Sequence, residues 1–167
     1  MTENTSLQQL ATADLCDAHA DLLQIAQPIF RSYGRLPQFN GRIYTVQVFK
    51  DNVLVRRQLE QTVKDAVMVI DGGGSLECAL VGDILAGLAA KNGWQGIVVN
   101  GCIRDAAAIA SLPIGIRALN THPLKSGKKG TGQENLPVTF AGVTFRPGDY
   151  LYADLDGLLV SSKPLTL

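Results

Sequence analysis

The sequence predicts an α/β domain that has a parallel or mixed β-sheet and a β-rich C-terminal part. Three short apolar runs have the character of buried strands, and helical patterns lie between them; the runs are 66–70, 96–101 and 114–119. A strand, helix, strand order of this kind implies right-handed crossovers within one sheet. The length of 167 residues favours a single domain, 1–167.

The N-terminal part predicts a helix, a strand and a second helix. Thr12 is the expected N-cap of a helix whose apolar residues recur at helical spacing until Pro28, where the helix should end. An Asn-Gly turn signal at 40–41 precedes a segment rich in β-branched residues, 41–52, which we expect to be a strand. Residues 55–63 have apolar side chains at helical spacing, so they predict a short helix.

The segment from Leu76 to Lys91 allows two interpretations. Apolar residues follow the i, i+3, i+4, i+7 pattern from Val81 onward, which predicts a helix that ends before an Asn-Gly pair at 92–93. This helix could begin near Leu76, with Gly82 in its interior, or it could begin at Gly82. We favour a start at Gly82, because glycine costs about 1 kcal/mol inside a helix but is accepted at an N-cap.

The C-terminal half predicts a short helix, a long loop and then hairpins. Residues 104–112 are expected to be the helix, and the polar, Gly/Pro-rich residues 121–137 the loop. The remaining segment, 138–162, alternates apolar and polar residues around turn signals. Its Asp-Gly pair at 156–157 is a strong short-range signal for a hairpin.

Charge and cysteine content limit the possible classes of function. Fifteen basic and fifteen acidic residues give a formal net charge of zero, which argues against a protein that binds nucleic acid directly. Cys16, Cys78 and Cys102 form no C-x-x-C motif, so we expect reduced thiols. The N-terminus lacks the pattern of a signal peptide, and no apolar run reaches the ~18 residues of a membrane span. We therefore expect a soluble, cytoplasmic protein that does not enter a membrane.

Unusual residues follow two of the predicted strands. Asp71 and three glycines come after the first strand, and an Arg-Asp pair at 104–105 comes shortly after the second. In α/β sheets, ligands gather beyond the carboxyl ends of strands, so both loops should open on one edge. A helix that starts at Gly82 would add free backbone N–H groups, which favour the binding of anions.

This edge could hold an anionic small molecule together with a divalent metal. Arg104 has a planar guanidinium suited to a carboxylate. Asp83 and Asp105 supply oxygen ligands, and magnesium is typically held by one or two carboxylates plus waters. A structural interpretation stays open, in which Arg104 and Asp105 form a surface ion pair or Asp105 caps the helix that follows.

Other polar residues are interpreted without a binding role. Lys125, Lys128 and Lys129 belong to the long polar loop, where a solvated position is more common than a binding patch. His19 and His122 are isolated histidines with no catalytic partner that the sequence reveals. The three glycines do not match the G-x-G-x-x-G pattern of dinucleotide-binding proteins.

The sequence resembles the family that contains regulator of ribonuclease E activity A (RraA) and the class II 4-hydroxy-4-methyl-2-oxoglutarate aldolases. The stretches that carry this resemblance are TADLCDAH, DGGGSLECALVGDILAGLAAKNGWQGIVVNGCIRD, LPIGIRAL and VTFAGVTFRPGDYLYADLDGLLVS, which together span nearly the whole chain. The resemblance implies a single compact domain of the swivelling β/β/α type, with a central mixed β-layer flanked by helices. It also implies a ring-shaped homotrimer that is sometimes doubled to a hexamer.

The enzymes of this family are marked by an Asp followed, after twenty residues, by Arg-Asp; this spacing occurs at Asp83, Arg104 and Asp105. The resemblance implies that Asp105 ligates the metal, usually Mg²⁺, and that Asp83 holds a metal-bound water. Arg104 should bind the carboxylate or keto oxygen of a small 2-oxo acid. The backbone expected to receive the pyruvate carboxylate is that of Gly82, Asp83, Ile84 and Leu85.

The reaction implied by the resemblance is the cleavage of 4-hydroxy-4-methyl-2-oxoglutarate to two pyruvates. Loss of carbon dioxide from oxaloacetate passes through the same enolate, so a secondary decarboxylase activity is expected. The alternative is a regulator that binds and inhibits ribonuclease E with little or no catalysis. Some family members lack the acid after the arginine, so Asp105 favours the enzyme. The aldolases also use acids of a neighbouring subunit, for which Asp14, Asp17 and Glu134 are candidates.

Overall fold

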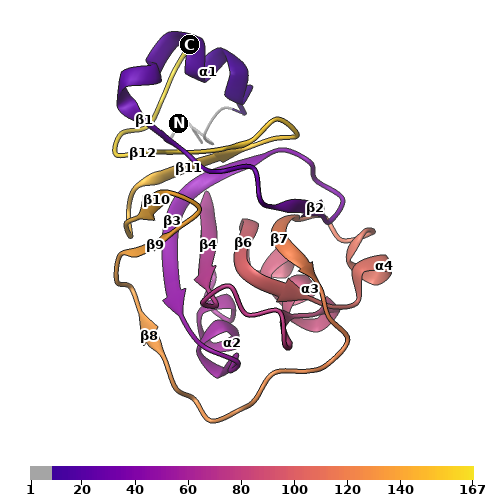
Figure 1. Ribbon diagram of the computed structural model, residues 1–167. Coiled ribbons are helices and arrows are strands. Elements are labelled where there is room, and N and C mark those ends of the chain that lie inside the picture. Colours follow the sequence, from indigo (N-terminus) through magenta and orange to yellow (C-terminus); the bar gives the residue numbers. More distant parts are fainter. Residues whose placement is uncertain (1–8) are drawn as a thin grey trace.

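The computed structural model describes residues 9–167 (Figure 1). The prediction that the N-terminus lacks a signal peptide falls largely on residues outside this range. The helices are α1 Thr12–His19, α2 Val53–Leu59, α3 Asp83–Lys91 and α4 Ala106–Ile109. The strands are β1 Leu23–Ile25, β2 Arg31–Tyr33, β3 Phe39–Gln47, β4 Ala66–Asp71, β5 Ala79–Val81, β6 Trp94–Ile103, β7 Gly115–Thr121, β8 Gln133–Glu134, β9 Val138–Phe140, β10 Val143–Phe145, β11 Tyr150–Ala153 and β12 Leu158–Ser161.

The centre of the fold is one mixed sheet of ten strands, and its order is β1-β12-β11-β3-β4-β6-β7-β2. Strand β5 pairs with β6, and β8 pairs with β3. The neighbours β3, β4, β6 and β7 run parallel, whereas β1, β2, β11 and β12 join antiparallel. The prediction of an α/β fold with a mixed sheet and a β-rich C-terminal part is therefore confirmed.

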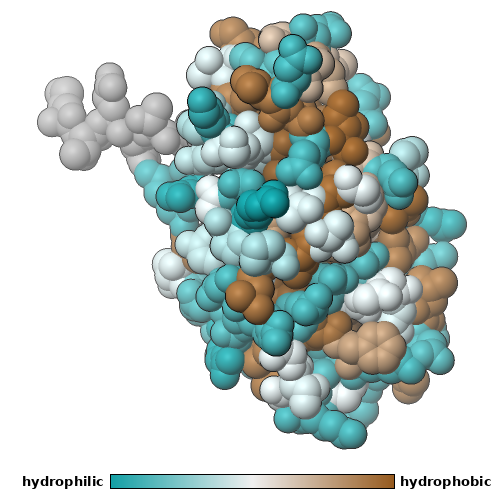
Figure 2. Space-filling model, turned by 60° about the vertical axis from the view of Figure 1, so that its left-hand side comes forward, coloured by the Kyte–Doolittle hydropathy of each residue, from teal (hydrophilic) through white to brown (hydrophobic). Residues whose placement is uncertain are grey.

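Large apolar side chains also occur on the surface. Figure 2 shows hydrophobic side chains gathered between hydrophilic ones on the face that it presents. Ile25 and Leu155, whose exposed fractions are 56% and 78%, border a hollow of about 410 Å³ beside the turn between β11 and β12. Exposed apolar surface of this kind commonly marks a place where a partner binds.

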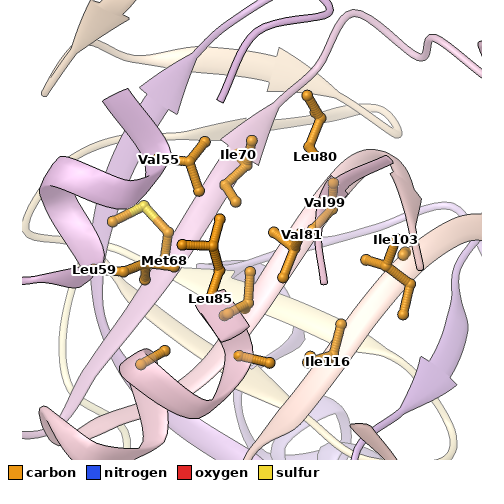
Figure 3. Close-up of a cluster of buried hydrophobic side chains, with 14 of the residues drawn as sticks. Val55, Leu59, Met68, Ile70, Leu80, Val81, Leu85, Val99, Ile103 and Ile116 are labelled. Atoms are coloured by element: carbon orange, nitrogen blue, oxygen red, sulfur yellow. The ribbon is translucent and has the colours of Figure 1, made fainter. Parts of the chain in front are cut away.

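Strand β4 is buried on both faces, which explains why it reads as a continuous apolar run. Every residue of β4 is buried. Met68 and Ile70 belong to a cluster that also contains apolar side chains of α2 and α3 (Figure 3). Val67 and Val69 belong to a second cluster, which contains the hairpin of β9 and β10. The helices and this hairpin therefore cover opposite faces of the strand.

Helix α1 differs from its prediction at both ends. Its N-cap is Ala11 rather than Thr12, and Thr12 instead donates its N–H and its hydroxyl to the carboxylate of Asp154, at 2.7 and 2.6 Å. The helix ends at His19, well before Pro28, and is followed by a short 3₁₀ turn and then β1. The chain leaves the helix because β1 pairs with β12, from the other end of the sequence.

Two predictions near β3 and α2 are also corrected. The Asn-Gly pair at 40–41 forms no turn but lies inside β3, where Gly41 lets the neighbouring backbone approach: an added Cβ would lie 2.8 Å from the carbonyl oxygen of Asp65. The strand ends at Gln47 rather than near residue 52. Helix α2 spans 53–59 instead of 55–63.

The favoured interpretation of the middle segment is confirmed, since Gly82 is the N-cap of α3. The residues before it form β5, a short strand that was not predicted. The predicted helix 104–112 is reduced to the four residues of α4. The hairpin at 156–157 is confirmed as the connection between β11 and β12. Within residues 9–167, no helix combines the length and apolar character needed to cross a membrane.

Candidate functional site

The topology brings both predicted loops to one edge of the sheet. Strands β4 and β6 are parallel neighbours, and Asp71 at the end of β4 lies opposite Asn100. Further along β6, Cys102 lies opposite Ala79 of β5. The carboxyl ends of these strands therefore meet at one edge, as the sequence predicts.

The two loops line different hollows at this edge. The carboxylate of Asp71 accepts hydrogen bonds from the side chain of Asn100 and the N–H of Gly73, both at 3.0 Å. With Gln47 and Phe49, Asp71 and Gly73 line a wide hollow of about 540 Å³. The second loop, with Arg104 and Asp105, borders a separate and smaller pocket.

This smaller pocket, of about 130 Å³, contains the predicted site. All six predicted residues line it: Gly82, Asp83, Ile84, Leu85, Arg104 and Asp105. They come from the N-terminus of α3 and from the loop between β6 and α4. The spacing in the sequence therefore corresponds to proximity in the fold, because β5 and β6 run side by side and each ends at the pocket.

The carboxylate of Asp105 caps α3 rather than its own helix. Its Oδ2 accepts the N–H of Asp83 at 3.1 Å, whereas no side-chain hydrogen bond caps α4. Asp105 has a left-handed backbone, with φ of 59°. Gly82 permits the close approach, since a Cβ added there would lie 2.7 Å from Asp105 Oδ2. Asp105 occupies the N-cap position of α4, as the structural interpretation allows, but its side chain does not cap that helix.

The guanidinium of Arg104 is only loosely held. Its Nε lies 4.0 Å from Asp105 Oδ2, and its Nη1 lies 3.5 Å from the carbonyl oxygen of Pro123. The side chains of Arg104 and Asp105 are 42% and 39% exposed. An exposed pair at this distance contributes little to stability, so most donors of Arg104 are available to a ligand. The backbone of Arg104 is held more firmly than its side chain, because its N–H donates to the carbonyl oxygen of Val81 at 2.9 Å.

The acidic groups at the pocket fit a weakly held hard cation rather than a structural metal. Residues 9–167 contain no cluster of three or more His, Cys, Asp or Glu side chains that could hold a metal ion. Among residues 9–167, Asp83 and Asp105 are the only acidic residues that line the pocket, and Oδ1 of Asp105 accepts no hydrogen bond within the described chain. One or two carboxylates plus waters suit Mg²⁺. The candidates Asp14, Asp17 and Glu134 do not line this pocket.

Several residues that line the pocket were not predicted. Asn52, at the start of α2, donates from Nδ2 to the carbonyl oxygen of Leu80 at 3.0 Å. Lys128 donates from its ammonium to Asn52 Oδ1, and Arg56 and Lys125 complete this side of the pocket. The interpretation of the lysines as a merely solvated loop is therefore incomplete. No sequence spacing could reveal these contacts, because they join segments that lie far apart along the chain.

The remaining reactive residues have structural surroundings. Burial raises the pKa of the Cys78 and Cys102 thiols, which keeps them protonated and poorly nucleophilic. All three cysteines are free thiols, as predicted. The imidazole of His19 contacts the carbonyl oxygen of Thr166 at 2.6 Å, and Nδ1 of His122 accepts the N–H of Leu124 at 3.1 Å. Neither histidine lines the pocket.

Known proteins resemble this chain over almost its full length. A protein of Azotobacter vinelandii is 53% identical over 95% of this chain and 98% of its own, and one of Laribacter hongkongensis is 58% identical over 92% and 97%. Both carry the provisional name 4-hydroxy-4-methyl-2-oxoglutarate aldolase.

Solved structures agree with the fold. The RNA-processing inhibitor RraA from Thermus thermophilis superimposes with a TM-score of 0.91 at 41% identity, and 95% of this chain and 96% of that chain are covered. A Geobacillus kaustophilus protein described as an S-adenosylmethionine:2-dimethylmenaquinone methyltransferase has a TM-score of 0.92 at 48% identity, over 93% and 97%. The RraA-like family model, described as Aldolase/RraA, matches residues 12–160. The chain therefore belongs to the aldolase/RraA family.

Proposed function

We propose that the protein is a divalent-metal-dependent aldolase that cleaves 4-hydroxy-4-methyl-2-oxoglutarate into two pyruvates, with oxaloacetate decarboxylation as a secondary activity. The observation that carries this proposal is the meeting of three groups at one small pocket. These groups are the N-terminus of α3, the carboxylate of Asp105 and the guanidinium of Arg104. The provisional names of the most similar relatives support the same reaction.

The size of the pocket favours a small organic acid. Its volume of about 130 Å³ is below the range of roughly 300–1,000 Å³ that is usual for drug-sized ligands. A methyl donor as large as S-adenosylmethionine fits such a pocket poorly. A five-carbon or six-carbon 2-oxo acid is small enough for it. We therefore give the methyltransferase name of one structural relative no weight for this chain.

The residues that line the pocket have separate proposed roles in substrate binding and proton transfer. The N–H of Asp83 is already bonded to Asp105, so the N–H groups of Ile84 and Leu85 are the ones that can receive the C1 carboxylate of the substrate. Arg104 orients the C2 keto oxygen. The carboxylate of Asp83 positions a water that accepts the proton of the 4-hydroxyl as the C3–C4 bond breaks. Asp105 would hold the divalent metal, which supplies Lewis-acid stabilisation of the developing enolate charge.

Pyruvate release tests this proposal directly. We expect Mg²⁺-dependent pyruvate formation from 4-hydroxy-4-methyl-2-oxoglutarate and, more slowly, from oxaloacetate, and we expect excess chelator to stop both. The absence of pyruvate from either substrate, with protein that remains folded by circular dichroism, would reject the aldolase.

A second candidate function is the regulation of ribonuclease E, and the similarity to the RNA-processing inhibitor RraA supports it. This function requires binding to a protein partner and does not require Asp105. Binding of purified ribonuclease E, measured by surface plasmon resonance, should then be unaffected by chelator and by Asp105→Ala. No binding at micromolar concentration would remove this candidate.

We also propose that the protein assembles as a homotrimer in the cytoplasm. The exposed side chains of Ile25 and Leu155, beside a hollow of about 410 Å³, are apolar surface that such an assembly could cover. Light scattering should then give three times the chain mass of 17.8 kDa. Leu155→Asp should lower this mass, whereas a wild-type protein with the mass of one chain would reject the trimer.

A further inference from the structure

Arg117 is a buried cation that has no role in the proposed functions. It lies in β7, and only 5% of its surface is exposed. Within residues 9–167 it forms no ion pair with an acid. Burial lowers its pKa below the ordinary value, and the charge of Asp154 opposes this effect only in part. A buried charge without an ion-pair partner is costly, so this guanidinium would be stabilised by an anion placed beside it.

Four of the five N–H groups of the Arg117 guanidinium are bonded within the fold. Nη1 donates to Ser32 Oγ at 2.9 Å and to the carbonyl oxygen of Ile116 at 3.2 Å. Nη2 donates to the carbonyl oxygens of Pro37 and Asp154. The fifth group, on Nε, meets no acceptor in the described part of the chain. All these acceptors are neutral groups, so they fix the position of the guanidinium and leave its charge uncompensated.

The Nε–H of Arg117 is accessible from a hollow in the surface. In residues 9–167, the one fully buried side-chain nitrogen or oxygen without a hydrogen-bond partner is Nε1 of Trp94. Nε of Arg117 also has no partner, so it cannot be fully buried. Arg117 lines the hollow of about 410 Å³ beside the turn between β11 and β12. This volume lies within the range of roughly 300–1,000 Å³ that is usual for small-molecule sites.

The rest of the hollow is mostly apolar. Its acids do not neutralise Arg117, because the carboxylate of Asp154 is bonded to Thr12 and to the N–H groups of Asp156 and Gly157, and the side chain of Asp156 is exposed. One buried cation therefore faces an apolar wall, which matches a ligand with an anionic head and an apolar body. The apolar residues of the lining are Ile25, Ala26, Pro28, Phe30, Leu155 and Leu158.

We infer that this hollow binds a medium-chain monocarboxylic acid, whose carboxylate accepts the Nε–H of Arg117 and whose apolar body packs against Phe30 and Leu158. The hydroxyl of Ser32 accepts a bond from Arg117, so its own hydrogen can be donated to the same carboxylate. A single positive charge suits a head group with one negative charge better than a phosphate with two.

The inferred site is separate from the proposed aldolase pocket. The two hollows have no lining residue in common, so the acid requires neither the metal nor the 2-oxo acid substrate. Ile25 and Leu155 at the rim are the side chains that the proposed trimer would cover. In such a trimer the acid would be enclosed where two copies meet.

Three probes test the inference on the wild-type protein by titration calorimetry. Octanoate has both the head and the body, 1-octanol has the body without the charge, and butanoate has the head with a shorter body. We expect octanoate to bind about 10-fold to 100-fold more tightly than 1-octanol, because a charge-assisted hydrogen bond is lost. Butanoate should bind about 100-fold more weakly than octanoate, because four methylene groups are missing. Equal affinity for octanoate and 1-octanol, or no binding of octanoate at millimolar concentration, would overturn the inference.

Two substitutions locate the binding at this hollow. Arg117→Met should abolish the preference for octanoate over 1-octanol, but it also removes the bonds to Pro37 and Asp154. Gly157→Phe leaves these bonds intact. Gly157 lines the hollow, its φ is not positive, and an added Cβ would meet nothing within 4 Å.

The ring of Gly157→Phe should occupy part of the hollow and lower the affinity for octanoate by about 10-fold or more. Gly157→Ala is the matched control, since it makes the same change to the backbone without the ring, and it should bind octanoate as the wild type does. Unchanged binding of octanoate by folded Gly157→Phe would place the acid elsewhere on the protein and reject this site.

Discussion

Asp105 and Asp154 both accept the first N–H of a helix that lies elsewhere in the chain, yet their surroundings differ. Asp154 binds Thr12 at the start of α1 through two bonds of 2.6 and 2.7 Å, and it also accepts the N–H groups of Asp156 and Gly157. Asp105 accepts one bond of 3.1 Å, from Asp83 at the start of α3. The guanidinium of Arg104 is distant, with its Nε 4.0 Å from Asp105 Oδ2.

The difference separates a structural carboxylate from one that is available for chemistry. Burial acts to raise the pKa of Asp154, but the hydrogen bonds from Thr12, Asp156 and Gly157 outweigh it, so the pKa lies below its ordinary value. Its carboxylate accepts four hydrogen bonds within the fold. Within residues 9–167, Asp105 keeps one oxygen without a hydrogen-bond partner, next to free helix N–H groups and a loosely held arginine. Similar capping geometry thus serves stability at Asp154, and at Asp105 it leaves a carboxylate oxygen for the ligand role that we propose.

The largest expected effect is that of Asp105→Ala on catalysis. Loss of the carboxylate that we propose holds the metal should reduce turnover of 4-hydroxy-4-methyl-2-oxoglutarate by about 1,000-fold or more. The free energy of unfolding should change by less than about 1 kcal/mol, because a single exposed bond is lost. Pyruvate assays and urea unfolding measure the two quantities. A variant that retains activity would contradict the role given to Asp105.

Gly82→Ala tests how closely Asp105 must approach the helix. The new methyl group would lie 2.7 Å from Asp105 Oδ2, so the carboxylate must move, and we expect activity to fall by about 10-fold to 100-fold. Gly87→Ala is the matched control on the same helix, since its added Cβ meets nothing within 4 Å. This control should keep full activity and gain up to about 1 kcal/mol in stability. Equal activity of both variants would show that the contact is unimportant.

Asp154→Ala should have the opposite profile to Asp105→Ala. It removes the bonds that hold the start of α1, so we expect the free energy of unfolding to fall by about 1–3 kcal/mol. Activity of the folded protein should be unchanged, because Asp154 does not line the site pocket. Asp156→Ala, which removes an exposed side chain of the same turn, should change stability by less than about 0.5 kcal/mol. A loss of activity in folded Asp154→Ala would contradict the purely structural role given to Asp154.

The smallest effect is a pH dependence of stability that comes from Asp154. Because its pKa is lower in the folded than in the unfolded protein, its contribution is present above the unfolded value of about 3.9. The contribution is lost as the pH falls through the lower folded value. The stability difference between wild type and Asp154→Asn should therefore be constant near neutral pH and shrink below about pH 4. Urea midpoints across this range would show it, and a difference that grows on acidification would contradict it.

Local sequence patterns were sufficient to predict a helix or strand where its own residues determine it. The buried strand β4 was predicted from its apolar run, and the start of α3 from the preference of glycine for a cap over a helix interior. Strands β1 and β5 were missed because each has three residues and exists through its partner. Strand β1 pairs with β12, at the other end of the chain, and β5 pairs with β6. Pairing of this kind leaves no periodicity in so short a segment.

By itself, the sequence determined the α/β fold class, the helix that begins after Gly82, and the spacing that joins Asp83 to Arg104 and Asp105. These follow from local propensity and from a crossover between neighbouring parallel strands. Only the tertiary structure decided that Asp105 caps α3 rather than its own helix. It also decided that Lys128 reaches the pocket through Asn52, 76 residues away. Such contacts form only after loop closure, whose outcome depends on the packing of the whole sheet rather than on nearby residues.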